Sequence, residues 1–352
     1  MAEATTTQKA VVATGTGEDF GSHIVIADVA APAGSPADGF VRVKVAAAAL
    51  NPVDWKMVKY NFLVAVENQV LGCDVAGTVV ALGAGVDELA VGDEVFGFQS
   101  IDIANGTFQD VLDIPAYLLL KRPAHLSATE AATLPVALYT AVFGIFRDQP
   151  GAGASHAFER DAAGGAPFLV WGGSSSVGQV VIQLAAAAGF HVIAVASAKQ
   201  HSYLRELGAA VTVDYHDDDV DAQIRAAAEA AGAPLRYAFD TVSVATTLRS
   251  AKLLDASADA PGFVTTITDV PEEAVANVSV IHTLMANIHA DGDKKAFMLD
   301  ARKKIAAWVA ELPVKSNPVT VIGTTWDAVP AGLERQHAGV SCTKLVIDRA
   351  EA

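Results

Sequence analysis

Strand-like and helix-like segments alternate regularly between residues 167 and 268 of this chain. Short runs rich in valine, isoleucine and aromatic residues are typical of strands, and helical patterns fill the intervals between them. Alternation at this spacing predicts a parallel sheet covered by helices on both faces, a doubly wound α/β arrangement. The expected strands are 168–172, 191–197, 210–215, 236–242 and 262–268, and the expected helices are 177–188, 200–207, 220–231 and 245–254.

The remainder of the chain follows other patterns. Valine- and glycine-rich runs in the first third, such as 41–50 and 74–83, are bounded by turn residues and predict a β-rich domain. Helical signals begin at Ser127, which has capping-box spacing to Glu130. The Gly-, Ala- and Pro-rich stretch 147–166 reads as a long exposed loop. From about residue 294, we expect one amphipathic helix followed by a strand at 343–349.

Composition limits the classes of partner and compartment. The chain has 352 residues and a formal net charge of -16, which argues against non-specific binding to nucleic acid or to anionic membranes. Two cysteines exclude a disulfide scaffold and favour a reducing compartment. Apolar runs such as 180–188 are too short to span a bilayer. We therefore expect a soluble, cytoplasmic protein without nucleic-acid or membrane partners.

A turn rich in glycine and serine joins the first expected strand to its helix. Small residues let a backbone approach a diphosphate closely, and amides at a helix N-terminus point at such an anion. Serine replaces the second glycine of the usual dinucleotide pattern, and a plain tight turn is the alternative. The position between strand and helix favours dinucleotide binding. The candidate cofactor-binding residues of this turn are Gly173, Ser174, Ser175, Ser176 and Val177.

The end of the second expected strand indicates which dinucleotide is bound. A site that prefers NAD usually has an acidic residue here, which bonds the ribose 2′-hydroxyl. This chain has Ser197 and Lys199 instead, with Tyr215 nearby, and these side chains offer donors and a positive charge to a 2′-phosphate. We therefore predict NADPH as the cofactor, and the carboxylate of Asp214 is the main feature that opposes this prediction. A solvated lysine without a ligand is the alternative.

Several motifs together resemble the medium-chain dehydrogenase/reductase superfamily. The motifs LNPVDWK at 50–56, LGCDVAGTVVALGAGV at 71–86, VGDEVFGF at 91–98, TLPVALYTA at 133–141 and the glycine turn occur in that family's order. The resemblance covers nearly the full length and is strongest to the zinc-independent branch of quinone oxidoreductases and enoyl or alkenal reductases. The chain is most similar to fungal enoyl reductases, which include enzymes that act in trans with polyketide synthases.

The resemblance implies a two-domain architecture and a class of reaction. A GroES-like β-barrel catalytic domain would comprise residues 1–135 together with the C-terminal part 300–352, which returns to it. A Rossmann NADP-binding domain would comprise residues 136–299. The active site would lie in the cleft between them. The implied function is NADPH-dependent hydride transfer to the β-carbon of an activated C=C bond, in an α,β-unsaturated ketone, aldehyde or thioester. Quinone reduction on the same scaffold, and a non-catalytic NADPH-binding sensor, are the alternatives.

The resemblance also implies roles for particular residues. Asn51, Lys56 and Tyr60 lie in the segment that borders the nicotinamide in similar enzymes, and Lys56 or Tyr60 would donate to the carbonyl oxygen or supply a proton. Thr140 resembles a threonine near the nicotinamide, and Asp240 ends a strand where its backbone would touch the cofactor. Turn-shaping, capping and solvated surface roles are the alternatives for these residues.

We expect no metal site and favour a monomer. Cys73 and Asp74 fall where zinc-dependent members carry His-Glu, but the sequence places no partner ligands with them. His282 and His289 have no third ligand nearby. The last expected strand runs into Asp269 and Pro271, and a charge and a proline discourage pairing at a sheet edge.

Overall fold

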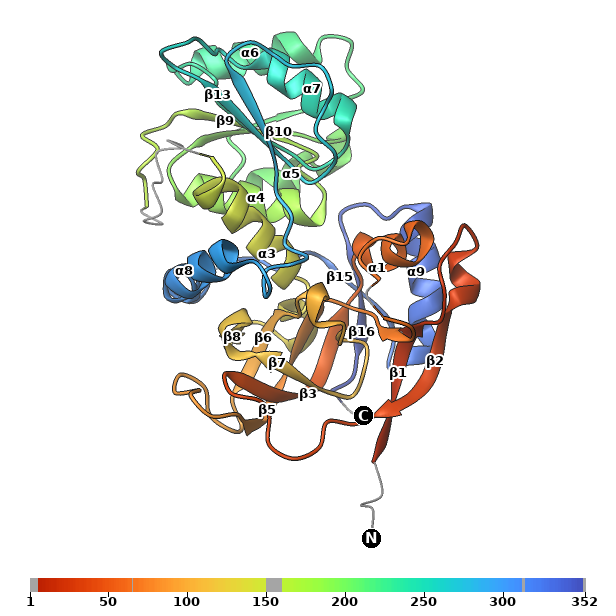
Figure 1. Cartoon of the computed structure of the whole chain (residues 1–352). Coiled ribbons are helices and arrows are strands. Elements are labelled where there is room, and N and C mark those ends of the chain that lie inside the picture. Colours follow the sequence, from red (N-terminus) through yellow and green to blue (C-terminus); the bar gives the residue numbers. More distant parts are fainter. Residues whose placement is uncertain (1–5, 65, 150–159, 312–313, 351–352) are drawn as a thin grey trace. The chain divides into compact units, whose positions relative to one another are not determined.

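The computed structural model describes residues 6–64, 66–149, 160–311 and 314–350 (Figure 1). The chain divides by its internal contacts into two compact units, each described separately below. Unit 1 comprises Met1–Val136 with Met285–Ala352, and unit 2 comprises Ala137–Leu284. The second boundary thus falls at Leu284 rather than at the expected 299. The centre of the expected loop 147–166 lies outside the described residues.

The described residues of unit 2 form a six-stranded parallel sheet with helices on both faces. In spatial order the strands are β11 (Val211–Val213), β10 (His191–Val195), β9 (Pro167–Trp171), β12 (Tyr237–Asp240), β13 (Gly262–Thr266) and β14 (Val278–His282). Figure 1 shows α4 (Ser176–Ala187) and α5 (His201–Glu206) on one face and α6 (Val220–Ala230) and α7 (Val244–Leu253) on the other. The predicted alternation of strands and helices is confirmed.

Apolar side chains from alternate strand positions hold α6 and α7 on their face of the sheet. Leu169, Trp171 and Ile193 are buried there against Ile224 and Leu253. Because the strands are parallel and covered on both faces, they are apolar on both sides, which is why their sequences lack a strict alternation.

The sheet of unit 2 extends one strand beyond the sequence-based expectation. β14 pairs in parallel with β13 over Gly262–Thr266, so the strand that ends near Asp269 is not the edge of this sheet. The argument for a monomer from Asp269 and Pro271 is therefore wrong, because it concerned an inner strand. The sequence of β14 was not recognised because most of its side chains are only partly buried and it follows an irregular segment.

The described part of unit 1 contains two sheets, which confirms the expected β-rich domain. The smaller sheet has the order β2 (Ile24–Ala30), β1 (Thr7–Ala13), β4 (Gln69–Val70). The larger has the order β15 (Val319–Gly323), β16 (Lys344–Asp348), β3 (Phe40–Ala49), β5 (Asp74–Leu82), β6 (Glu94–Phe98), β8 (Leu119–Lys121), and β7 (Val111–Pro115) also pairs with β3. The last segment of the chain thus returns to pair with β3.

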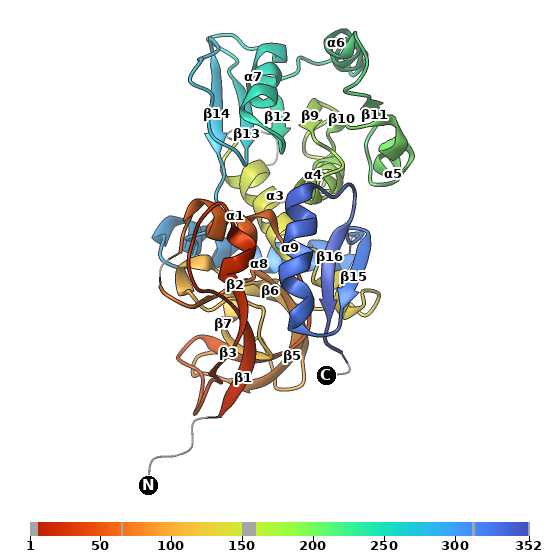
Figure 2. The ribbon, with the colours of Figure 1, turned by 90° about the vertical axis from the view of Figure 1, so that its right-hand side faces the viewer.

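Helices pack beside these sheets within unit 1. Helix α1 (Pro52–Tyr60) contacts α9 (Val329–Ala338), where the rings of Trp55 and His337 lie 4.5 Å apart. Figure 2 shows α9 beside β16. The expected amphipathic helix near residue 294 is α8 (Gly292–Glu311). Short α2 (Ala128–Ala131) begins with the predicted capping box, in which the hydroxyl of Ser127 accepts from the amide of Glu130.

One helical stretch among the described residues is long and apolar enough to cross a membrane by length and composition. It runs from Ala128 to Arg147 and includes α3 (Pro135–Val142), and 83% of its most apolar window is buried inside the protein. It is longer than the apolar runs expected from the sequence. Burial at this level is typical of a core helix, which passes the same test.

Candidate functional site

The turn between β9 and α4 in unit 2 is shaped by two glycines. Gly172 has φ of +83°, a conformation that side chains rarely adopt. A Cβ atom on Gly178 would lie 2.3 Å from the carbonyl oxygen of Gly172, so only glycine lets the first turn of α4 pack against the loop. These two positions bring the N-terminus of α4 directly after the strand, as a diphosphate-binding turn requires.

The serines of this turn have different roles. The hydroxyl of Ser175 caps α4 by accepting from the amide of Gly178 at 2.9 Å, and it donates to the hydroxyl of Thr241 at 2.9 Å. Its side chain is therefore engaged within the fold. The first amides of any α-helix lack intrahelical acceptors, and in α4 they include those of Ser176 and Val177. Partial positive charge from the helix adds to these amides.

The segments that follow β10 and β11 carry the side chains that we expect to face an adenosine phosphate. Ser197 is half-buried, whereas Lys199 and Tyr215 are exposed, and the Tyr215 ring lies 4.0 Å from that of His216. Within the described residues, Lys199 forms no ion pair. Its ammonium is therefore available to a ligand at this edge of the sheet.

Asp214 is the acidic group at this edge. Its carboxylate accepts from the amide of Ala198 at 2.9 Å, and from the amide and ring nitrogen of His216 at 3.0 and 2.7 Å. These hydrogen bonds, chiefly those from the two backbone amides, lower the pKa of Asp214 to about 2. The carboxylate is charged at neutral pH, but three donors within the fold already engage it.

Two further predicted cofactor residues are buried in unit 2. The Asp240 carboxylate accepts from the amides of Val242 and Ser243 at 2.9 and 3.1 Å, and burial raises its pKa. One oxygen of its side chain therefore shapes the turn after β12. Thr140 is 6% exposed within α3.

A cluster of buried polar groups occupies the start of α1, β5 and β16 in unit 1. The Lys344 ammonium lies 3.1 Å from Asp74 Oδ2 and 2.5 Å from Asn51 Oδ1, and Asn51 Nδ2 donates to Asp74 at 2.8 Å. The other oxygen of Asp74 accepts from the amide of Val136 at 2.7 Å, at the start of α3. All of these side chains are less than 4% exposed. Asn51 is thus engaged by the cluster, which favours a positioning role for it rather than contact with a substrate.

Asp54 and Cys73 complete the cluster. The Asp54 carboxylate accepts from the amide of Asn51 at 2.7 Å and from the Cys73 thiol at 3.7 Å. Burial is the largest cause that raises the pKa of Asp54 to about 7, and the nearby Asp74 raises it further. Burial also raises the pKa of the Cys73 thiol well above its usual value, so this cysteine is a packing residue and not a reactive thiolate.

The predicted donors Lys56 and Tyr60 lie on the exposed side of α1. Tyr60 is 56% exposed, its ring is 6.0 Å from that of Trp55, and the Lys56 ammonium lies 5.8 Å from the Trp55 ring. Neither polar group is held by the buried cluster, so both can reach a ligand. The cluster fixes the start of the helix that carries them.

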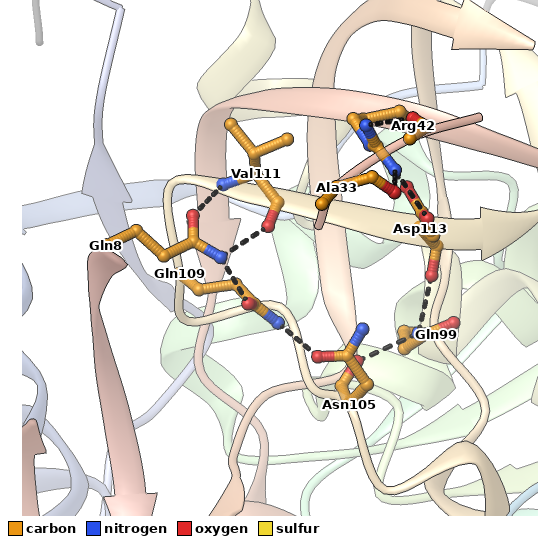
Figure 3. Close-up of polar contacts among 9 residues, drawn as sticks. Gln8, Ala33, Arg42, Gln99, Asn105, Gln109, Val111 and Asp113 are labelled. Atoms are coloured by element: carbon orange, nitrogen blue, oxygen red, sulfur yellow. Dashed lines mark hydrogen bonds and ion pairs between the residues drawn. The ribbon is translucent and has the colours of Figure 1, made fainter. Parts of the chain in front are cut away.

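A small cavity of about 10 Å³ lies beside this cluster in unit 1. It is lined by Met57 and Cys73 on one side and by Ser100 and Asn105 on the other. Figure 3 shows how amide side chains fix the loop on that second side. Gln8 donates to Gln109 at 2.8 Å, Gln109 donates to the Asn105 side chain at 2.6 Å, and Gln99 donates to the Asn105 carbonyl at 2.8 Å.

Comparisons with known proteins identify the family. Residues 37–124 match the alcohol dehydrogenase GroES-like domain, and residues 176–261 match the zinc-binding dehydrogenase family. Dehydrogenase orsE of Emericella nidulans is 30% identical over 93% of this chain and 96% of its own length. Trans-enoyl reductase milB of Cordyceps militaris is 30% identical over 96% of this chain and 97% of its own. An alcohol dehydrogenase superfamily protein from Novosphingobium aromaticivorans, 23% identical, shares the fold with a TM-score of 0.79 over 97% of this chain and 99% of that one.

The chain belongs to the medium-chain dehydrogenase/reductase superfamily. Its fold combines the GroES-like and Rossmann domains of that superfamily, and it is an oxidoreductase. Members use a nicotinamide cofactor, and the turn of unit 2 fits one, because Gly172 and Gly178 let the N-terminus of α4 follow β9 directly.

The description of the second matched family mentions zinc. The described residues of this chain do not fit a zinc site. Among the described residues, no three His, Cys, Asp or Glu side chains are grouped so that they could hold a metal ion. Where the superfamily's zinc-dependent members carry His-Glu, the Cys73 thiol donates to Asp54, and Asp74 is neutralised by Lys344. The ammonium of Lys344 supplies the positive charge of this cluster.

Sequence reasoning named Asn51, Cys73 and Asp74 of this cluster but missed Lys344. A lysine that begins an apolar strand usually lies at an exposed strand end, so the residue type gave no signal. Its partners lie 270 and 293 positions earlier in the chain, at Asp74 and Asn51, and only the pairing of β16 with β3 brings them together.

The raised pKa of Asp54 predicts a pH dependence of stability. Because the folded pKa of about 7 exceeds the unfolded value of 3.8, protonation stabilises the folded state. This contribution is complete below about pH 4 and is lost as the pH rises through 7, with a limiting slope of roughly 1.4 kcal/mol per pH unit. We expect Asp54→Asn, whose amide oxygen still accepts from Asn51, to remove this component. Urea unfolding between pH 4 and 8 measures it.

Asp28→Asn, on the exposed strand β2, controls for the loss of one carboxyl group. The interpretation fails if the difference in unfolding free energy between Asp54→Asn and the wild type is the same at every pH in this range.

Proposed function

We propose that this chain is an NADPH-dependent ene reductase that acts without zinc. It would transfer hydride to the β-carbon of an activated C=C bond, in an α,β-unsaturated ketone, aldehyde or thioester. The buried cluster is the observation that favours this reaction, because Lys344 pairs with Asp74 and Asp54 accepts from Cys73, the two residues at the position of the zinc ligands. Oxidation of an alcohol in this family relies on a metal as Lewis acid. A C=C bond conjugated to a carbonyl is already polarised and needs only donors for the developing charge.

The relatives support the same class of reaction. Besides milB, which matches nearly the full chain at 30% identity, trans-enoyl reductase thnE of Trichoderma harzianum is 34% identical over 68% of this chain. We extend the activity in those names to this chain, together with a small-molecule unsaturated carbonyl substrate.

The donors on α1 would act on the substrate. When bound, the nicotinamide supplies the hydride from its C4 atom. Negative charge then develops on the carbonyl oxygen, where the Lys56 ammonium or the Tyr60 hydroxyl would donate a hydrogen bond. Either group, or water held by it, would deliver the proton that completes the α-carbon. Asn51 and Asp54 would hold the start of the helix in place.

The NADPH preference rests on the charge at the end of β10. The exposed ammonium of Lys199 would meet the 2′-phosphate, with hydroxyls from Ser197 and Tyr215 beside it. The Asp214 carboxylate accepts three hydrogen bonds within the fold, which reduces its repulsion of a phosphate. Charge-assisted bonds to Lys199 would exceed that remaining repulsion.

The position of reduction tests the proposed reaction. With NADPH and a medium-chain enone, we expect the saturated ketone as product, because the donors stabilise the enolate formed by attack at the β-carbon. Product analysis by mass spectrometry and NMR distinguishes it from the allylic alcohol. Formation of the allylic alcohol, or NADPH consumption with quinones and not with enones, would contradict the proposal.

If Tyr60 or Lys56 is the donor, its substitution should affect kcat and not the binding of NADPH. Tyr60→Phe or Lys56→Ala should lower kcat, on the order of 100-fold if that group is the single oxyanion donor, with little change in the Kd of NADPH. Lys9→Ala, which removes an exposed lysine on β1 that pairs with Asp28, is the control. Unchanged kcat in both test variants would place the donor elsewhere.

Lys199 predicts a cofactor-selective effect. Lys199→Ala should raise the KM for NADPH by about tenfold, the equivalent of one charge-assisted bond, and leave NADH kinetics nearly unchanged. Steady-state kinetics with both cofactors measure this, and NADH serves as the internal control. Equal losses for both cofactors would show that Lys199 supports the fold, and a wild-type preference for NADH would refute the assignment.

A further inference from the structure

A groove in unit 2 lies between α6 and α7. The two helices are labelled in Figures 1 and 2, and side chains from both line a groove of about 300 Å³. Positively charged side chains from both helices line it above an apolar floor. The lining residues are Asp221, Arg225, Ala245, Leu248, Arg249, Lys252 and Leu253.

The charge of this groove is opposite to that of the whole chain. Its lining carries three cations and one carboxylate, a net of two positive charges, on a protein whose formal net charge is -16. Outside the lining, Glu273 pairs with Lys252 at 2.7 Å, but both side chains are more than half exposed. A pair this exposed is weak and yields readily to a stronger ligand.

The two arginines have donors to spare within the described structure. Arg225 donates through Nη2 to the carbonyl of Lys252 at 3.2 Å and forms no ion pair there. Arg249 donates through Nε to Asp221 at 2.7 Å, and its terminal nitrogens make no other hydrogen bond among the described residues. Guanidinium groups bind phosphate oxygens with two parallel hydrogen bonds, and here two of them project from separate helices.

Arg249 also packs against an aromatic ring of the sheet. Its guanidinium lies 5.1 Å from the ring of Trp171, which is buried at the end of β9. A guanidinium that rests on an aromatic face and on Asp221 loses less freedom when it binds a ligand. Beside it, Leu248 and the buried Leu253 offer an apolar surface to the uncharged part of a ligand.

We propose that the groove between α6 and α7 binds a small phosphate ester that carries an apolar group. A dianionic phosphate matches the net charge of the lining and would accept from Arg225, Arg249 and Lys252, while its organic part would pack on Leu248 and Leu253. This site uses neither the turn after β9 nor Lys199, so it does not rest on the proposed reaction.

Phenyl phosphate is a suitable probe, because it combines a dianionic phosphate with an apolar ring. Isothermal titration at constant ionic strength should show saturable, single-site binding. Arg225→Gln, at an exposed position, should raise its Kd by about tenfold or more. Arg205→Gln on α5, which removes an exposed arginine from the other face of the sheet, is the matched control and should bind as the wild type does.

Two further comparisons make the assignment specific. Lys199→Ala should bind phenyl phosphate as the wild type does, whereas loss of binding in that variant would move the ligand to the nucleotide turn and overturn the proposal. Inorganic phosphate and benzoate should both bind more weakly than phenyl phosphate. Equal Kd values for Arg225→Gln and Arg205→Gln, or equal binding of all three anions, would also overturn it.

Discussion

The ion pair between Lys344 and Asp74 holds together the segments that the rest of unit 1 depends on. Both groups are buried, so each has lost its hydration, and their attraction offsets that cost only because further hydrogen bonds engage the remaining atoms. Asn51 bridges the two charges, and the backbone amide of Val136 donates a hydrogen bond to the second oxygen of Asp74. Removal of either charge would leave the other buried alone, a loss of about 3–5 kcal/mol. The start of α1, the first residues of β5 and the last strand of the chain are therefore fixed as one arrangement.

Local patterns in the sequence predicted local structure well. The alternation of strands and helices in unit 2, and the capping box of Ser127 and Glu130, depend on residues within a turn or a few turns of one another. β14 was missed because its partly buried side chains give a weak signal. Without β14, the strand that ends near Asp269 was mistaken for the edge of the sheet. The buried cluster could not be predicted, because its members come from three distant segments. Nothing in the sequence indicated that a lysine would join Cys73 and Asp74.

The edge of the sheet in unit 2 shows why a count of charges is a poor guide to a binding site. Asp214 stands beside the residues proposed to hold a phosphate, and its low pKa means that it is charged. Its oxygens, however, are directed at Ala198 and His216. A carboxylate that accepts three short hydrogen bonds has much of its charge compensated locally, whereas the Lys199 ammonium is exposed to solvent and to any ligand. The direction of each polar group therefore matters more than the sum of the charges.

The same reasoning separates the cations of this acidic protein by what they can do. Lys344 is buried and bound to Asp74 and Asn51, so it holds segments of the fold in place and is not exposed to a ligand. Arg249 is partly engaged, because its Nε donates to Asp221 and its guanidinium lies 5.1 Å from the Trp171 ring, whereas its terminal nitrogens make no hydrogen bond among the described residues. Arg225 bonds only to a backbone carbonyl in the described structure, so its charge has no carboxylate to balance it. A protein with 40 acidic and 24 basic residues has many carboxylates that could pair with such a side chain. An arginine that lines a groove and pairs with no carboxylate in the described structure can therefore bind an anion from solution.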